Sequence, residues 1–116
     1  MFTALNAADP APISKAVVDG KEYPVYAYFK DVKPVSVENP VYPYQASQER
    51  RGGDTLVGAV VGEKGKVIST FVAKSTAGKD IQQAVCAAVR QWKFPKLKDG
   101  ERPIAYVLFI PLSMNP

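Results

Sequence analysis

The residue types that most often carry chemistry are nearly missing from this chain of 116 residues, which has one cysteine, Cys86, and no histidine. A Ser-His-Asp triad needs a histidine, and the common zinc sites combine several cysteines or histidines. Aspartate, glutamate, lysine and tyrosine side chains could transfer protons, but no pair of them stands in a recognisable motif. The sequence therefore predicts no enzyme, no metal site and no cofactor. Cys86 is expected to be a half-buried, inert thiol.

The charge pattern argues against a nucleic-acid partner. The net charge is +4, but the positive residues of the second half are dispersed, whereas nucleic-acid binders concentrate them on one face or helix. No apolar run approaches the roughly 20 residues of a membrane helix. Residues 1–10 lack the features of an intact signal peptide, so an anchor or export signal is expected outside this chain.

Residues 1–37 are predicted to form an N-terminal arm, and residues 38–116 the domain itself. Two short β-prone stretches, residues 16–18 and 21–23, flank Asp19-Gly20, which suits a type I′ turn and predicts a short hairpin. Residues 25–29 are also β-prone, but Pro24 lacks an N–H group, so any strand here is expected at a sheet edge. A proline-rich stretch, residues 34–44, then predicts extended chain.

One helix is the clearest element of the remaining chain. Its stripe of Ile81, Val85, Val89 and Trp92 has helical spacing and predicts a helix over residues 80–92 with a buried tryptophan. Asp80 stands three residues before Gln83, which is the spacing of an N-terminal capping box. The helix therefore has one apolar face to bury against a sheet.

Three strands are predicted around this helix, over residues 55–61, 66–74 and 104–112. The first two are joined by a short turn and form an antiparallel hairpin. Chain direction then favours an α+β fold: a three-stranded antiparallel sheet in the order 2-1-3, with the helix on one face. The third strand lies at an edge and is apolar on both faces. Its second face is expected to meet the N-terminal arm, a partner subunit or a ligand.

From Pro40 to Leu112 the sequence resembles the C-terminal domain of the TonB family. The family has a large apolar residue in the middle of its first strand, where this chain has Gly58-Ala59, and nothing before Pro40 has a family counterpart. The resemblance rests on the order of several short motifs: Tyr42-Pro43, residues 57–61, Gly65-Lys66-Val67, Ser75 with Gly78, Ala84, Ala87-Ala88-Val89-Arg90, Trp92-Lys93-Phe94-Pro95 and Asp99-Gly100.

This resemblance implies a periplasmic domain of an energy transducer that performs no chemistry. Such a domain binds the TonB box, a short peptide of outer-membrane transporters, by strand addition at its last strand. It also implies an inner-membrane proton-channel partner reached through regions absent from this chain, and a possible homodimer. Contacts with the peptide are expected from the domain entrance and the last strand, at Asn39, Pro40, Tyr42, Pro43, Ile104, Ala105, Tyr106, Val107, Leu108, Phe109 and Ile110.

Two alternatives remain open at the level of sequence. Tyr42 and Pro43 could pack against the core and stiffen the chain instead of touching a peptide. The whole chain could also be a soluble periplasmic accessory or assembly protein of the same fold, with no role in energy transduction. In that case residues 25–29 would cover the sheet edge or exchange between subunits.

Overall fold

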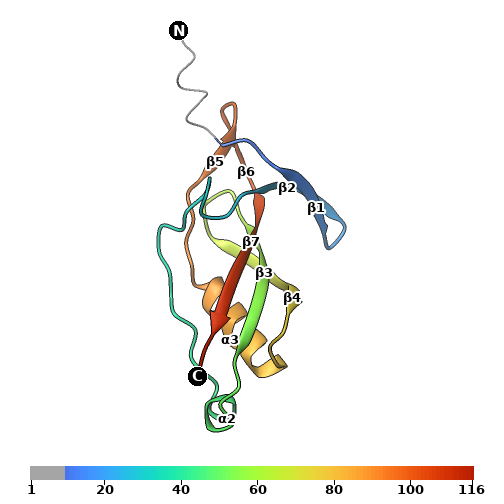
Figure 1. Ribbon diagram of the computed structural model, residues 1–116. Helices are drawn as coiled ribbons and strands as arrows, with labels where there is room; N and C mark the ends of the chain where they lie inside the picture. The colour runs from blue at the N-terminus through green and yellow to red at the C-terminus, as the bar shows by residue number, and fades with distance from the viewer. Residues whose placement is uncertain (1–9) are drawn as a thin grey trace.

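The computed structural model describes residues 10–116, which form a five-stranded mixed sheet with one long helix on one face (Figure 1). The helix is α3 (Lys79–Arg90), and a short helix, α2 (Tyr44–Gln48), precedes the central strand. A separate two-stranded sheet pairs β5 (Leu97–Asp99) with β6 (Arg102–Ile104). In spatial order, the strands of the main sheet are β1 (Ser14–Val18), β2 (Lys21–Tyr26), β7 (Tyr106–Met114), β3 (Gly53–Val61) and β4 (Val67–Ser75).

The α+β class is confirmed, but the three-stranded antiparallel sheet is wrong as a description of the whole sheet. The predicted order 2-1-3 survives inside it as β4-β3-β7, with both pairs antiparallel. The sheet continues because β2 pairs in parallel with β7, Val25 opposite Val107 and Tyr26 opposite Leu108. The last strand is therefore no border strand at Val107 and Leu108, contrary to the prediction.

The N-terminal hairpin is confirmed as β1 and β2. Asp19 and Gly20 both have positive φ angles, 51° and 80°, as a type I′ turn requires. The expectation that Pro24 restricts its strand to an edge is wrong, because β2 lies between β1 and β7. The β2–β7 pairing begins only at Val25. Pro24 therefore has no partner on β7, and its lack of an N–H group removes no hydrogen bond on that side. The predicted arm begins at residue 1, and its first nine residues lie outside the described part.

The main core lies between α3 and the sheet. Ile81, Val85 and Val89 are fully buried, and Trp92 is 6% exposed, as the helical stripe predicts. The helix begins one residue earlier than expected, after Gly78, and no side chain caps it. Asp80 is thus in the first turn and not at the N-cap. In the first turn its carboxylate accepts a hydrogen bond from the N–H of Ile81.

The opposite face of the sheet is covered only in part. A second cluster, Tyr23, Val25, Val60 and Val107, places the hairpin against the upper part of this face. Below it the ring of Phe71 lies directly over Gly58 and meets Phe109 edge to face, with ring centres 5.9 Å apart. On this face, no other element of the described chain covers the ends of β7, β3 and β4 that lie away from the hairpin (Figure 1).

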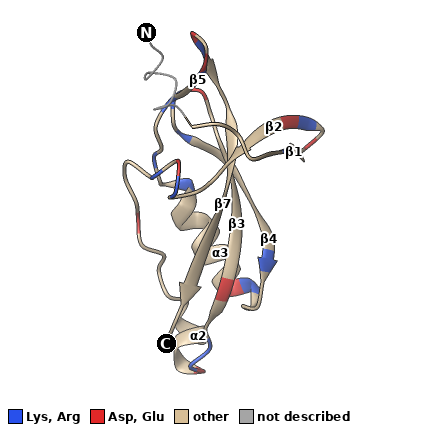
Figure 2. Ribbon diagram, turned by 45° about the horizontal axis from the view of Figure 1, so that its top comes forward, with Lys and Arg blue, Asp and Glu red and all other residues tan. Residues whose placement is uncertain are grey.

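Lysine, arginine, aspartate and glutamate residues lie mostly in turns and near strand ends of the described chain (Figure 2). No helix within residues 10–116 is long and apolar enough to cross a membrane. In the same part of the chain, no three aspartate, glutamate, cysteine or histidine side chains gather where they could hold a metal ion.

Candidate functional site

The two halves of β7 differ in how their backbone is paired. On one side, all nine residues of β7 pair with β3. On the other side only Val107 and Leu108 pair with β2, and no other strand of the described chain continues the ladder there. We call residues 106–108 the closed half and residues 109–114 the open half. The open half leaves backbone groups on one side without a strand partner, so an extended chain can add there, although Pro111 has no N–H to donate to it.

The structure distributes the predicted strand residues over three places. Ile104 belongs to β6, and Ala105 precedes β7. The residues of the closed half are fully buried: Tyr106, Val107 and Leu108. The remaining two begin the open half: Phe109, half-buried, and Ile110, buried. A guest strand could therefore pair with Phe109 and Ile110 on the side of β7 away from β3. At Val107 and Leu108, β2 already occupies that side.

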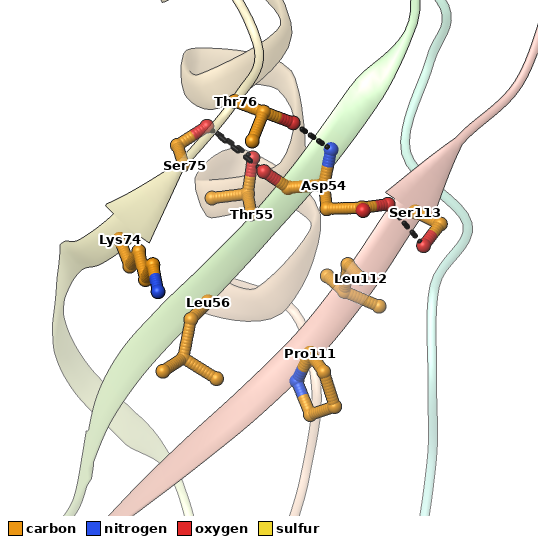
Figure 3. A pocket seen from close by; sticks show the side chains of 9 residues that line it. All are labelled: Asp54, Thr55, Leu56, Lys74, Ser75, Thr76, Pro111, Leu112 and Ser113. Atoms are coloured by element: carbon orange, nitrogen blue, oxygen red, sulfur yellow. Dashed lines mark hydrogen bonds between the residues drawn. The ribbon is translucent and has the colours of Figure 1, made fainter.

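A hollow of about 370 Å³ lies on the sheet face away from α3, beside the open half (Figure 3). Its floor follows from the register, because Lys74, Leu56 and Pro111 stand side by side on β4, β3 and β7. The surrounding hydroxyl and carboxylate groups already bond one another, as in the 2.6 Å bond from the Ser113 hydroxyl to Asp54 Oδ1. The full lining is Asp54, Thr55, Leu56, Lys74, Ser75, Thr76, Pro111, Leu112 and Ser113.

Since these polar groups are paired with one another, the hollow mainly offers apolar contact. Thr55 Oγ1 and Ser75 Oγ are 2.9 Å apart, and the backbone N–H of Asp54 donates to Thr76 Oγ1 at 3.0 Å. Leu56 is half-buried and Pro111 exposed. A small apolar side chain is the ligand group that such a surface favours.

Tyr106 anchors the closed half and is not available for contact with a guest. Its hydroxyl donates to the carbonyl of Pro95 at 2.7 Å, and its ring meets that of Tyr26 edge to face at 5.6 Å. Burial raises the pKa of the Tyr106 phenol well above its usual value, with a smaller effect of Tyr26. This side chain therefore stays neutral and ties β7 to both the hairpin and the chain after α3.

The entrance residues lie along α3, and the extended chain that contains them passes beside the C-terminal end of β7 without pairing with it (Figures 1 and 3). The Trp92 indole N–H donates to the carbonyl of Glu38 at 2.8 Å. Asn39 and Val41 border a small cavity of about 280 Å³ against the exposed side of α3. Within the described residues, no backbone hydrogen bond joins residues 39–43 to β7. The two predicted groups of contact residues are thus not joined by backbone hydrogen bonds within the described part, and their contact with a peptide stays a prediction.

Tyr42 and Pro43 take structural positions. The Tyr42 ring packs on the main core while its hydroxyl donates to the carbonyl of Arg51. Pro43, half-buried, stands at the N-terminal end of α2 with extended backbone angles. Packing is thus observed for Tyr42, and contact with a peptide stays a prediction for both residues.

An ion pair missed by the sequence analysis fixes the chain before β3. Arg51 holds Asp80 through two hydrogen bonds of 2.8 and 3.2 Å and also donates to Glu49 at 2.6 Å. The hydrogen bonds from Arg51 lower the pKa of the Asp80 carboxyl, and those from Gln45 and then Arg51 lower the pKa of Glu49. No local motif could have revealed a pair separated by 29 residues.

The comparisons with known proteins bear on this arrangement. Residues 38–113 match the family described as the Gram-negative bacterial TonB protein C-terminal. The chain belongs to the TonB C-terminal domain family. The predicted recognition is thereby confirmed. A search of curated protein sequences gives no significant match.

A solved TonB C-terminal domain has the same fold. The solution NMR structure of the Pseudomonas aeruginosa TonB CTD superposes with a TM-score of 0.62 at 20% sequence identity, covering 77% of this chain and 92% of that one. At this identity the likeness concerns the fold alone. The family match begins at residue 38, so both strands of the hairpin that closes half of β7 lie outside it. The hairpin therefore lies outside the family match, although the structural match, at 77% of this chain, extends beyond residues 38–113.

Proposed function

We propose that this TonB domain binds the TonB box of outer-membrane transporters by strand addition to the open half of β7. The single observation that supports the proposal is that β7 is paired on both sides at Val107 and Leu108 but on one side only from Phe109 onward. An extended peptide supplies the missing backbone partners there. The binding segment is thus shifted toward the C-terminus relative to the predicted stretch, of which Phe109 and Ile110 remain.

Geometry limits where such a guest strand can lie. β2 occupies the same side of β7 up to Leu108, and the chain then turns away at Ala27, whose carbonyl accepts the N–H groups of Asp31 and Val32. A guest on residues 109–114 would therefore lie end to end with β2. Since successive side chains of a strand alternate between faces, every second guest side chain would reach the hollow beside Leu56 and Pro111.

The wider role follows from the family and is part of the same proposal. The domain acts in the periplasm as a binding module without catalysis, and residues 38–116 form the binding domain with residues 1–37 as an arm. Contact with an inner-membrane proton-channel complex would run through regions beyond this chain, and a homodimer is a further expectation. The entrance residues, Asn39, Pro40, Tyr42 and Pro43, would touch only parts of the guest that extend past β7.

Backbone NMR of the ¹⁵N-labelled chain tests the proposal. The titrant is a synthetic peptide carrying the TonB box of a transporter from the same organism, and the expected result is progressive amide shifts along residues 109–114. A control peptide with proline at two alternate positions cannot complete the ladder and should leave these signals in place. Unchanged signals at millimolar box peptide, or equal shifts with the proline peptide, would contradict strand addition.

The hairpin favours one other function, that of a soluble accessory protein whose arm covers the sheet edge. The pairing of β2 with Val107 and Leu108 is the specific observation behind it. If the hairpin serves to block the strand, peptide binding should be absent in the full chain at any concentration. Binding at the open half while β2 stays paired favours the transducer instead.

A further inference from the structure

The second border of the sheet is β4, whose outer side pairs with no strand of the described chain. The β3–β4 register shifts twice, and between these shifts Ser69, Thr70, Phe71 and Val72 pair regularly with β3. A regular stretch of edge strand directs alternate N–H and C=O groups outward. β4 contains no proline, and its one charged residue is Lys74, outside the central stretch. This stretch therefore lacks the usual side-chain protection against pairing.

A groove of about 280 Å³ runs between this stretch and α3. The hydroxyl oxygen of Thr70 is shielded from solvent there and has no hydrogen-bond partner. Buried hydroxyls in folded proteins are nearly always paired, so an unpaired one suggests a group that arrives from outside. The lining consists of Thr70, Phe71, Val72, Lys79, Gln82, Gln83, Cys86 and Arg90.

Two cations stand at opposite ends of the groove. Lys79 and Arg90 are exposed, and neither takes part in an ion pair within residues 10–116. Lys79 lies in the first turn of α3, where the helix dipole disfavours a positive charge, so helix stability does not account for it. Eleven helical steps separate the two by roughly 16 Å along the helix axis, a span that about five residues of extended chain would cover.

We propose that the groove between β4 and α3 binds an extended acidic peptide segment of a partner protein, which adds to β4 as a further strand. Carboxylates near its two ends pair with Lys79 and Arg90, and a hydroxyl between them reaches Thr70. Charge also argues against a second copy of this chain as the occupant, because two such edges would bring their cations together. The proposal concerns β4, which β3 separates from β7, and it does not depend on a guest at the open half.

The test is a titration of the ¹⁵N-labelled full chain with the capped heptapeptide Ser-Glu-Val-Thr-Val-Glu-Ser. Its two glutamates and the central threonine point to one side of an extended chain, as the groove requires. Amide shifts are expected at residues 69–72 and along α3, with half-saturation on the order of 1 mM. The same peptide with lysine in place of glutamate serves as the control and is expected to cause no such shifts.

Two matched variants separate a groove from general attraction. Lys79→Glu should weaken the glutamate peptide about five- to tenfold, since it replaces attraction by repulsion at one end. The variant should fold normally because an acidic residue is favoured at a helix start. Lys98→Glu makes the same charge change at an exposed position on β5 and should leave affinity unchanged.

Four outcomes of the peptide titrations would overturn the proposal. They are shifts confined to residues 109–114, equal binding of the lysine peptide, equal weakening by both variants, and no shift at millimolar peptide. A dimer that forms through residues 69–72, seen by sedimentation together with the same amide shifts at rising protein concentration, would assign the edge to a second copy and overturn it as well.

Discussion

The two halves of β7 share one strand, one helix behind it and one neighbour in β3, yet they face different surroundings. The closed half lies between β2 and β3, and its three side chains are fully buried. The open half has β3 on one side, and Pro111, Leu112 and Ser113 keep contact with solvent. The closed half is part of the core, because it is buried on both faces and paired on both edges. Along the unpaired edge of the open half, a guest strand can replace solvent.

This difference assigns stability and binding to separate segments of the same strand. The hairpin that closes the first half comes from residues before the family match. A strand edge left wholly bare invites unspecific pairing, and covering part of it is one of the ways in which proteins limit that risk. The length of the open half then limits how long a peptide the domain can pair with.

The largest expected effect is on the free energy of unfolding, when one leucine in each half is replaced by alanine. Leu108→Ala removes a fully buried side chain from the main core and should lower the free energy of unfolding by about 2–5 kcal/mol. Leu112→Ala is the matched change in the open half, where the side chain is half-buried, and should lower it by about 1–2 kcal/mol. Urea unfolding of both variants measures the two losses.

The same pair of variants also separates folding from binding. Box-peptide affinity should fall for Leu112→Ala, because Leu112 borders the hollow and its packing on the main core holds the open half in place, and remain for the folded fraction of Leu108→Ala. Equal losses of unfolding free energy would show that the open half is packed as tightly as the closed one.

A change in the hairpin turn should act on the hairpin that covers the closed half and not on the open half, with an intermediate effect. Gly20 has φ near 80°, which side-chain-bearing residues adopt at a cost of about 1–2 kcal/mol, and added atoms there would meet no neighbour. Gly20→Val should therefore speed amide hydrogen exchange in β1 and β2 while leaving residues 109–114 unchanged. Gly20→Asn, which tolerates this backbone conformation, is the control. Faster exchange throughout β7 would mean that the halves open together.

Much of this architecture could be predicted from the sequence, because its signals are local. Apolar spacing gives α3, and Asp19-Gly20 gives the first hairpin. Short links give the β3–β4 pair and, through chain direction, the order β4-β3-β7. Each of these depends on residues that are close along the chain.

What could not be predicted depends on distant contacts. The parallel pairing of β2 with β7 joins residues 82 positions apart, so no periodicity reports it. Simple alternation in β4 fails because register shifts place Val67 toward the helix but Phe71 on the other face. The reason for Gly58, at the place where the family resemblance implies a large apolar residue, is visible only in the fold. The Phe71 ring fills the space beside it, and a Cβ atom at position 58 would lie 2.1 Å from that ring.

The smallest expected effect concerns the ion pair between Arg51 and Asp80 at the base of the open half. Arg51 lowers the pKa of Asp80, so the stability from this pair is fully present above the unfolded pKa of about 3.9 and is lost as pH falls through the lower folded value. Asp80→Asn should thus destabilise the domain slightly at neutral pH and leave it equal to the original chain in acid. The two curves of unfolding free energy against pH should converge below about pH 4.

Salt provides a second test of the same pair. Because both side chains are more than a third exposed, high salt should shrink the difference between Asp80→Asn and the original chain at neutral pH. Glu49 keeps its own hydrogen bonds from Gln45 and Arg51 in the variant, so part of the acid dependence should remain. If instead Asp80→Asn weakened box-peptide binding as strongly as Leu112→Ala, the base of the open half would contribute directly to binding, and the boundary drawn at residue 109 would describe only the backbone pairing.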